Sequence, residues 1–368
     1  MIRVVFDVAE LAPGMGKSMG IYNYARGLLT HLALLLPEGW ELHVTCNAGG
    51  ARDFSPDHPR VVQHVVLNEA QPGTLARQRW MRFGAQSFVR RLGAQIYFTP
   101  KGFLPGFWGR SHGVTTVAVL HDLIPLWYAQ HHPSQFSLME RVLVNGGLVR
   151  TAKWADQLIV ISKATAEHVK SVTDRVAESM HIVHNGVPVL SARDHSPLSE
   201  PYLFAMASSL PHKNLAGILA AYRCYRALSE RPLPMVVCGV PDPAEEGVRV
   251  VSGLDGPTLH SYYAHAEAFL FLPFIEGFGF PPLEAQAHGT PVVCSDIPAL
   301  REVTQGKALL VPPSDADAAA RALISAIAAS KHRHSRGGGS ATGTPGYSWE
   351  QCAAGVMAVL KRAAESLQ

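Results

Sequence analysis

The fold is decided at residues 265–303, “HAEAFLFLPFIEGFGFPPLEAQAHGTPVVCSDIPALREV”. An apolar run at 268–272 predicts a buried strand, and the glycines and paired prolines that follow it predict a loop and then a helix. A second apolar run at 291–295 predicts another buried strand after that helix. Two buried strands joined through a helix are typical of a parallel sheet.

The same alternation of strand and helix patterns continues along the rest of the chain. Further apolar, β-rich runs lie at 2–6, 41–46, 95–99, 115–120, 157–162, 181–184, 202–206 and 234–239. Continuous apolar strands separated by helical patterns indicate parallel sheets that are buried on both faces. We therefore expect an α/β protein with doubly wound, Rossmann-like parallel sheets.

The length of 368 residues predicts about two domains. A stretch rich in proline and serine at 186–202 is the best boundary, and a Gly-rich stretch at 331–348 isolates a final helix. We expect two Rossmann-like domains at 1–190 and 191–345, followed by a helix at 346–368 that packs back toward the first. Two such domains imply a cleft where the carboxyl ends of their strands face each other.

Composition excludes several classes of protein. With 47% hydrophobic and 17% charged residues the chain is not disordered, and a net charge of +3 predicts no nucleic-acid partner. Five scattered cysteines without a C-x-x-C pair predict reduced thiols and no structural zinc. Met1 leads directly into the first strand, and the longest apolar run is too short to span a bilayer. We expect a cytoplasmic protein, peripheral at most to the inner face of the membrane.

A glycine cluster follows the first strand, in “APGMGKSMGIYNYARGLL” at 12–29. A P-loop ending at Gly16 needs a glycine where the chain has Leu11, and the spacing of Gly14, Gly16 and Gly20 fails the dinucleotide fingerprint, which disfavours a dehydrogenase. A strand, a Gly-rich turn and a helix from about Gly20 still aim N–H groups at an anion. A turn without a ligand is the alternative.

Two glutamates, Glu276 and Glu284, flank the glycines and prolines of the deciding stretch. Because Pro281 and Pro282 open the helix, we expect Glu284 in its first turn and Glu276 on the preceding loop. A carboxylate there can accept hydrogen bonds from the two hydroxyls of a ribose, and Glu276 can approach a second polyhydroxylated group. The alternative is that Glu284 complements the helix dipole and Glu276 is a solvated loop residue.

The segment “EGFGFPPLEA”, with the “GTPVVCSDIPALREV” that follows, resembles the E-x7-E signature of glycosyltransferase family 4. Other segments resemble the family in the expected order: “GIYNYARGLL”, “HDLIP”, “VISKATAEHV”, “HNGV” and “SSLPHKNLAGIL”. The resemblance implies the GT-B fold and a retaining enzyme that moves a hexose from a nucleotide sugar to a glycan or lipid-linked acceptor.

The resemblance assigns roles to residues of this chain. Glu284 would hold the ribose of the donor, and Glu276 would contact its hexose together with the N–H groups of Gly277, Phe278 and Gly279.

Three further roles follow from the same resemblance. Lys213 would neutralise the diphosphate, and Gly16 and Gly20 belong to the glycine loop that faces it. His121, at the end of a predicted strand, would lie near the transferred sugar. Because N–H groups, a helix end and Lys213 can stabilise the leaving group, we expect no metal and no cofactor.

The chain departs from the family at the second diphosphate cation. Where many members carry an arginine, residues 206–209 read “MASS” and the position before the lysine is His212. The candidates for the missing charge are Arg26, Lys17 and His212 itself.

Residues 76–92, “ARQRWMRFGAQSFVRRL”, predict an amphipathic helix. One face carries Met81, Ala85, Phe88 and Leu92. The other carries Arg79, Arg82, Gln86 and Arg90, with Phe83 beside them. A basic face with an exposed aromatic ring could rest on anionic lipid. An ordinary core helix with a solvated outer face is the alternative.

The donor is expected to be GDP-mannose, on general similarity to bacterial polysaccharide mannosyltransferases. The alternatives are a glycosyltransferase that uses a UDP-sugar, a nucleotide-sugar epimerase of the same fold, and a non-catalytic module that binds a sugar nucleotide.

Overall fold

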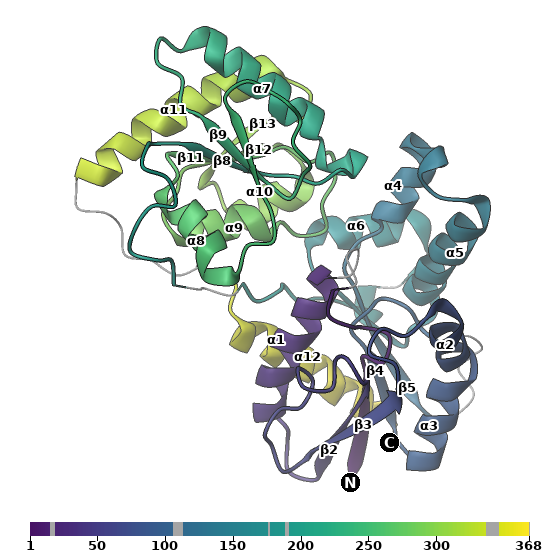
Figure 1. The fold of residues 1–368 in the computed structure, drawn as a ribbon. Helices are drawn as coiled ribbons and strands as arrows, with labels where there is room; N and C mark the ends of the chain where they lie inside the picture. The colour runs from purple at the N-terminus through teal and green to yellow at the C-terminus, as the bar shows by residue number, and fades with distance from the viewer. Residues whose placement is uncertain (15–18, 106–112, 176, 188–190, 336–345, 368) are drawn as a thin grey trace. The chain divides into compact units, whose positions relative to one another are not determined.

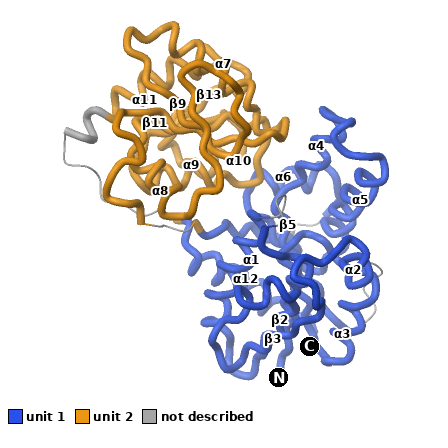
Figure 2. The backbone as a smooth tube through the Cα atoms, viewed as in Figure 1, with its two compact units in different colours: residues 1–186, 347–368 blue, residues 187–346 orange. Residues whose placement is uncertain are grey.

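The structure is a computed structural model that describes residues 1–14, 19–105, 113–175, 177–187, 191–335 and 346–367 (Figure 1). Figure 2 shows its two compact units: unit 1 is Met1–Gly186 with Tyr347–Gln368, and unit 2 is Val187–Gly346. The chain thus leaves unit 1, forms all of unit 2, and returns.

Unit 1 is built on a seven-stranded parallel sheet of order β3-β2-β1-β4-β5-β6-β7. Its strands are β1 (Ile2–Asp7), β2 (Trp40–Asn47), β3 (Val61–Leu67), β4 (Ile96–Thr99), β5 (Thr115–Leu120), β6 (Gln157–Val160) and β7 (Met180–Ile182). The order of the strands reverses between β1 and β4. In open α/β sheets, ligands bind at the carboxyl ends of the strands that flank such a switch point.

Unit 2 has a six-stranded parallel sheet of order β10-β9-β8-β11-β12-β13. Its strands are β8 (Leu203–Met206), β9 (Met235–Cys238), β10 (Val248–Val251), β11 (Ala268–Phe271), β12 (Val292–Ser295) and β13 (Ala308–Val311). Its switch point lies between β8 and β11. The two sheets therefore repeat one winding.

Helices cover both sheets (Figure 1). In unit 1 they are α1 (Met19–Leu34), α2 (Thr74–Arg79), α3 (Ala85–Leu92), α4 (Ile124–His131), α5 (Leu138–Trp154), α6 (Lys163–Val172) and α12 (Trp349–Glu365). In unit 2 they are α7 (Leu215–Leu228), α8 (Gly256–His265), α9 (Phe280–Ala287), α10 (Pro298–Thr304) and α11 (Ala316–Ser335). Among the described residues, none of these helices is both long and apolar enough to cross a membrane.

The final helix, α12, belongs to unit 1 and packs on α1 and on strands β4, β5 and β6. The apolar stripe that its sequence predicts, Cys352, Val356, Val359 and Leu360, is buried. Trp349, at its start, lies so close to Gly27 and Gly186 that a Cβ on either glycine would meet the indole ring. Segments from the beginning, middle and end of the chain therefore share one core.

The predicted fold class is confirmed, and all ten predicted strands are present. Three more strands, β3, β10 and β13, were not predicted, and each lies at an edge of its sheet. Edge strands are covered less completely, and each of these three has exposed or half-exposed positions. Polar residues interrupt the apolar runs of β3 and β10, whereas β13 is apolar throughout.

Candidate functional site

Two of the predicted site residues meet at the switch point of unit 2. Lys213 ends a short 3-10 turn, Pro211–Lys213, that follows β8, and Glu276 lies on the loop that follows β11. Although they are 63 positions apart, the Lys213 ammonium donates to the Glu276 carboxylate in an ion pair. The side chains are only 26% and 12% exposed. The winding of the sheet thus brings together a cation and an anion that the sequence separates.

The loops that carry this pair are bonded to each other. Asn214, in a left-handed conformation with φ of 54°, caps α7 and donates from Nδ2 to the carbonyl of Leu272 at 2.9 Å. The backbone N–H of Phe274 donates to the carbonyl of His212 at 2.8 Å. Two loops that are hydrogen-bonded to each other therefore carry Lys213 and Glu276.

The Glu276 loop ends at Gly279, whose backbone requires glycine. Its φ is 114°, and a Cβ built there would lie 2.4 Å from Cδ2 of Leu300. The Phe278 side chain is buried and its ring packs against that of Phe280 at 5.3 Å between centroids. The loop backbone is therefore held in place from both sides.

Glu284 lies one turn further along the helix than its sequence predicts. Because α9 begins at Phe280, Glu284 is its fifth residue, in the second turn, and the first turn contains no acidic residue. The interpretation that Glu284 complements the helix dipole is therefore wrong. Burial raises the pKa of its carboxyl to about 7, and a hydrogen bond from the Tyr263 hydroxyl on α8 partly opposes that shift. Glu284 is a mostly buried carboxyl that holds its proton more tightly than an exposed one.

His212 does not supply a standing positive charge. It is 5% exposed, and burial, followed by the neighbouring charge of Lys213, lowers the pKa of its imidazole to about 3. Of the other candidates for a second cation, Arg26 lies on the exposed side of α1, and Lys17 falls outside the described residues, as does the predicted site residue Gly16.

His121 follows β5 in unit 1 and is neutral. Burial lowers its pKa to about 4, although a hydrogen bond to the carbonyl of Pro100, at 2.7 Å from Nε2, opposes the shift. Because a carbonyl only accepts, Nε2 carries the proton and Nδ1 is an acceptor. The ring packs nearly perpendicular to that of Tyr24, with 4.7 Å between centroids. His121 thus offers an acceptor, not a proton, to a neighbouring group.

Gly20, the second residue of α1, differs from Gly279. A Cβ on Gly20 would meet nothing within 4 Å, and its φ lies outside the left-handed region. The described fold therefore places no requirement for glycine at this position.

The switch point of unit 1 contains charged residues that the sequence reasoning missed. Glu10, after β1, and Lys101, after β4, form an ion pair across 91 positions. The buried carboxylate of Asp7, at the end of β1, accepts hydrogen bonds from four groups. The available signal was that each residue follows or ends a predicted strand, at the edge where α/β sheets bind ligands.

The predicted helix at 76–92 is interrupted. A π-helical turn, Trp80–Gly84, separates α2 from α3 and shifts the buried face, so that Trp80, Ala85 and Val89 are the buried residues. Of the predicted inner face, Met81, Phe88 and Leu92 pack only partly. Phe83 is 65% exposed, and the arginines Arg79, Arg82 and Arg90 are also exposed, as predicted.

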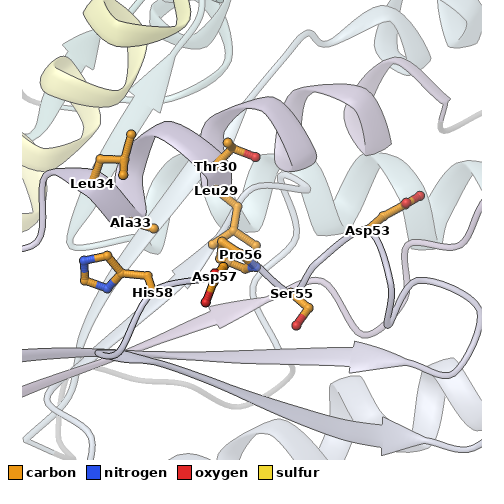
Figure 3. Close-up of a pocket in the computed structure, with 9 residues that line it drawn as sticks. All are labelled: Leu29, Thr30, Ala33, Leu34, Asp53, Ser55, Pro56, Asp57 and His58. Carbon is orange, nitrogen blue, oxygen red and sulfur yellow. The ribbon is translucent and has the colours of Figure 1, made fainter.

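A separate pocket of about 210 Å³ lies between α1 and the loop at 53–58 (Figure 3). Leu29 and Ala33 of α1 form one wall, and the loop forms the other. None of the predicted site residues lines it. Among the described residues, no group of three or more His, Cys, Asp or Glu side chains is placed to hold a metal ion.

Comparisons with known proteins agree with this architecture. Residues 20–189 match the model of the family described as Glycosyltransferase Family 4, and residues 190–338 match that of Glycosyl transferases group 1.

Curated relatives are found over part of the chain. The O-antigen chain mannosyltransferase B of Escherichia coli is 25% identical over 279 residues, which are 70% of this chain and 71% of the relative. The O-antigen chain mannosyltransferase RfbU of Salmonella typhimurium is 26% identical over 208 residues, 53% of this chain and 56% of the relative.

Among solved structures, sucrose-phosphate synthase from Thermosynechococcus elongatus covers the whole of both chains with a TM-score of 0.69 and 17% identity. At this identity the likeness shows the fold alone, and that fold is GT-B.

Proposed function

The chain belongs to the glycosyltransferases that these two family models describe, and on that premise we propose that it transfers mannose from GDP-mannose to a saccharide acceptor in polysaccharide biosynthesis, with retention of configuration. The observation that carries the proposal is the Lys213–Glu276 pair at the switch point of unit 2, beside the helix that bears Glu284. The names of the two curated relatives support mannose as the sugar.

The proposed chemistry follows from the charges that develop as the donor bond breaks. The anomeric carbon becomes positive and the β-phosphate becomes negative, so a fixed cation beside the phosphate stabilises the transition state. Lys213 is that cation. Without a donor, Glu276 holds the ammonium in place. When the donor binds, the ammonium turns to the diphosphate and the Glu276 carboxylate accepts hydrogen bonds from the hexose.

Glu284 is proposed to bind the ribose. Its carboxylate accepts hydrogen bonds from both ribose hydroxyls, and only the deprotonated form offers both oxygens as acceptors. Because burial raises its pKa to about 7, we expect donor affinity to increase as the pH rises through neutrality.

A binding screen tests the proposal. The wild type is titrated with GDP-mannose, GDP-fucose, UDP-glucose and UDP-N-acetylglucosamine, and hydrolysis of each is followed without an acceptor. Saturable binding of GDP-mannose that Glu284→Ala abolishes and Glu230→Ala retains supports the proposal, since Glu230 is an exposed glutamate of the same unit. If the protein prefers a UDP-sugar, GDP-mannose is not its donor. If it converts a nucleotide sugar to its epimer, it is an epimerase and not a transferase. If it binds none of the four, the proposed transfer is wrong.

We also propose that the exposed basic surface formed by Arg79, Arg82, Phe83 and Arg90 contacts anionic lipid and so reaches a lipid-linked acceptor. Vesicle flotation with and without phosphatidylglycerol tests this contact. Binding to the anionic vesicles that charge reversal of the three arginines removes supports it, and absence of binding by the wild type ends it.

A further inference from the structure

The switch point of unit 1 contains an ion pair that is largely withdrawn from water. The Glu10 and Lys101 side chains are 12% and 19% exposed. Removing two charges from water can cost more free energy than their attraction returns, so stability alone is a weak reason for such a pair. The pair lies where the strand order reverses, which is where sheets of this class bind ligands.

Asp7 holds together the segments that form the floor of the site, which are the ends of β1, β2 and β4 and the start of the π-helical turn. Its carboxylate accepts from the backbone N–H of Ala9 at 3.1 Å, from Oγ1 of Thr45 at 2.7 Å, from Nε1 of Trp80 at 3.0 Å and from the hydroxyl of Tyr97. Because its oxygens are occupied within the fold, Asp7 supports the site and leaves Glu10 as the acceptor for a ligand.

Part of the wall of the site is apolar. Trp80 begins the π-helical turn, whose next residue, Met81, lines a small cavity with Phe103, Glu10 and Lys101. The Lys101 ammonium lies 5.8 Å from the centre of the Phe103 ring. The cavity holds about 10 Å³, which is the room that one water needs. A single hydroxyl group has this size.

We propose that the Glu10–Lys101 pair binds a hydroxyl group of the acceptor saccharide. The hydroxyl enters the cavity, donates to the Glu10 carboxylate and accepts from the Lys101 ammonium. This inference rests on the proposed glycosyl transfer, to which it adds the acceptor subsite.

The hydrogen-bonding groups of the pair favour this chemistry. A fully ionised phosphate has no donor for the Glu10 carboxylate, and an ammonium ligand has no acceptor for the Lys101 ammonium. A hydroxyl is neutral and is both a donor and an acceptor, so it satisfies both members of the pair at once.

The test measures binding of sugar and of donor separately. Methyl α-mannoside, methyl α-glucoside and methyl β-galactoside are titrated into wild type, Glu10→Gln and Lys101→Met, with saturation-transfer NMR as the readout. We expect the wild type to bind at least one glycoside and both variants to bind it at least tenfold more weakly. The control is Glu167→Gln with Lys170→Met, which removes an exposed ion pair of the same unit and leaves binding unchanged.

Donor binding distinguishes this inference from the proposed function. Glu10→Gln and Lys101→Met retain the wild-type affinity for GDP-mannose, whereas Lys213→Ala loses the donor and retains the glycoside. Failure of all three glycosides to bind the wild type overturns the subsite, and so does equal binding by wild type and both variants, even if their melting temperatures fall. Glycoside binding that requires the pair, without binding of any nucleotide sugar, leaves the subsite standing and overturns the proposed function.

Discussion

The two sheets wind in the same order, and each has a lysine and a glutamate paired across its switch point, but the order of the charges is reversed. In unit 1 the acid, Glu10, follows the first strand of the sheet and the lysine follows the fourth. In unit 2 the lysine, Lys213, follows the first and the acid, Glu276, follows the fourth. The strands that lead in also differ, because β1 ends at the buried Asp7 and β8 ends at Met206.

The two units therefore place different charged residues at equivalent positions. The winding of the sheet determines where the loops meet, and the residues at the ends of the strands determine whether a lysine or a glutamate stands at each position. In unit 1 the buried carboxylate of Asp7 is fully engaged in hydrogen bonds that hold the floor of the site. In unit 2 the loops are hydrogen-bonded to each other, and Lys213 lies beside the loop that ends at Gly279.

Asp7→Ala is expected to have the largest effect. It leaves the donors of Thr45, Trp80 and Tyr97 buried without their acceptor, and we expect a loss of about 4 kcal/mol or more in the free energy of unfolding. Urea unfolding followed by tryptophan fluorescence measures it. Asp174→Ala, at an exposed position, is the control and changes stability by less than about 0.5 kcal/mol. A loss of less than 1 kcal/mol for Asp7→Ala would show that the four hydrogen bonds do not hold the floor.

Lys213→Ala is expected to lower the rate of sugar transfer about 100- to 1000-fold, because it removes the cation that we propose for the leaving diphosphate. Donor affinity and initial rates measure it, and Lys307→Ala, at an exposed lysine of the same unit, is the control. If Lys101→Ala weakens donor binding as much as Lys213→Ala, the two switch points do not divide donor and acceptor between them.

Glu284→Gln tests how much the raised pKa of Glu284 lowers the free energy of unfolding above neutral pH. The folded protein binds its proton more tightly than the unfolded chain between pH 4.5 and about 7, so the carboxyl makes stability fall as the pH rises through this range. The fall in the free energy of unfolding is at most about 3.4 kcal/mol. We expect the variant to lose donor binding and to be more stable than wild type at pH 8, by comparison of urea unfolding at pH 5 and pH 8. A variant that is less stable at both pH values contradicts the assigned cost.

Two glycines provide the smallest effect. Gly279→Ala costs about 1–3 kcal/mol through backbone strain and the contact with Leu300. Gly20→Ala has no such contact and stabilises its helix by up to about 1 kcal/mol. Thermal unfolding measures both. If Gly20→Ala nevertheless weakens donor binding, glycine is required there by a ligand that approaches the backbone; unchanged binding removes Gly20 from the site.

Sequence reasoning recovered the central strands and not all of the edge strands. A central strand is buried on both faces, so it can be recognised in the sequence as a continuous apolar run. The edge strands β3 and β10 contain polar residues, Gln63, His64 and Arg249, that interrupt their apolar runs. The edge strand β13 is apolar throughout but short, and it has exposed positions.

Only those features of the site that depend on a short stretch of sequence could be predicted. The Gly-rich loop that ends at Gly279 and the helix that begins after it could be predicted from a short stretch of sequence. The two ion pairs could not, because each joins residues that only the winding of a sheet brings together. The π-helical turn at Trp80–Gly84 also escaped, since Trp80 turns toward Asp7, a partner 73 positions away.

The closure of unit 1 by α12 has a consequence for how the chain is made. A ribosome completes unit 2, which is continuous from Val187 to Gly346, before it synthesises the helix that finishes unit 1. Until Trp349 reaches the glycines at positions 27 and 186, α1 lacks its covering helix and an apolar face remains open to chaperones and proteases. A nascent chain released before Trp349 therefore contains a finished second unit joined to an unfinished first one.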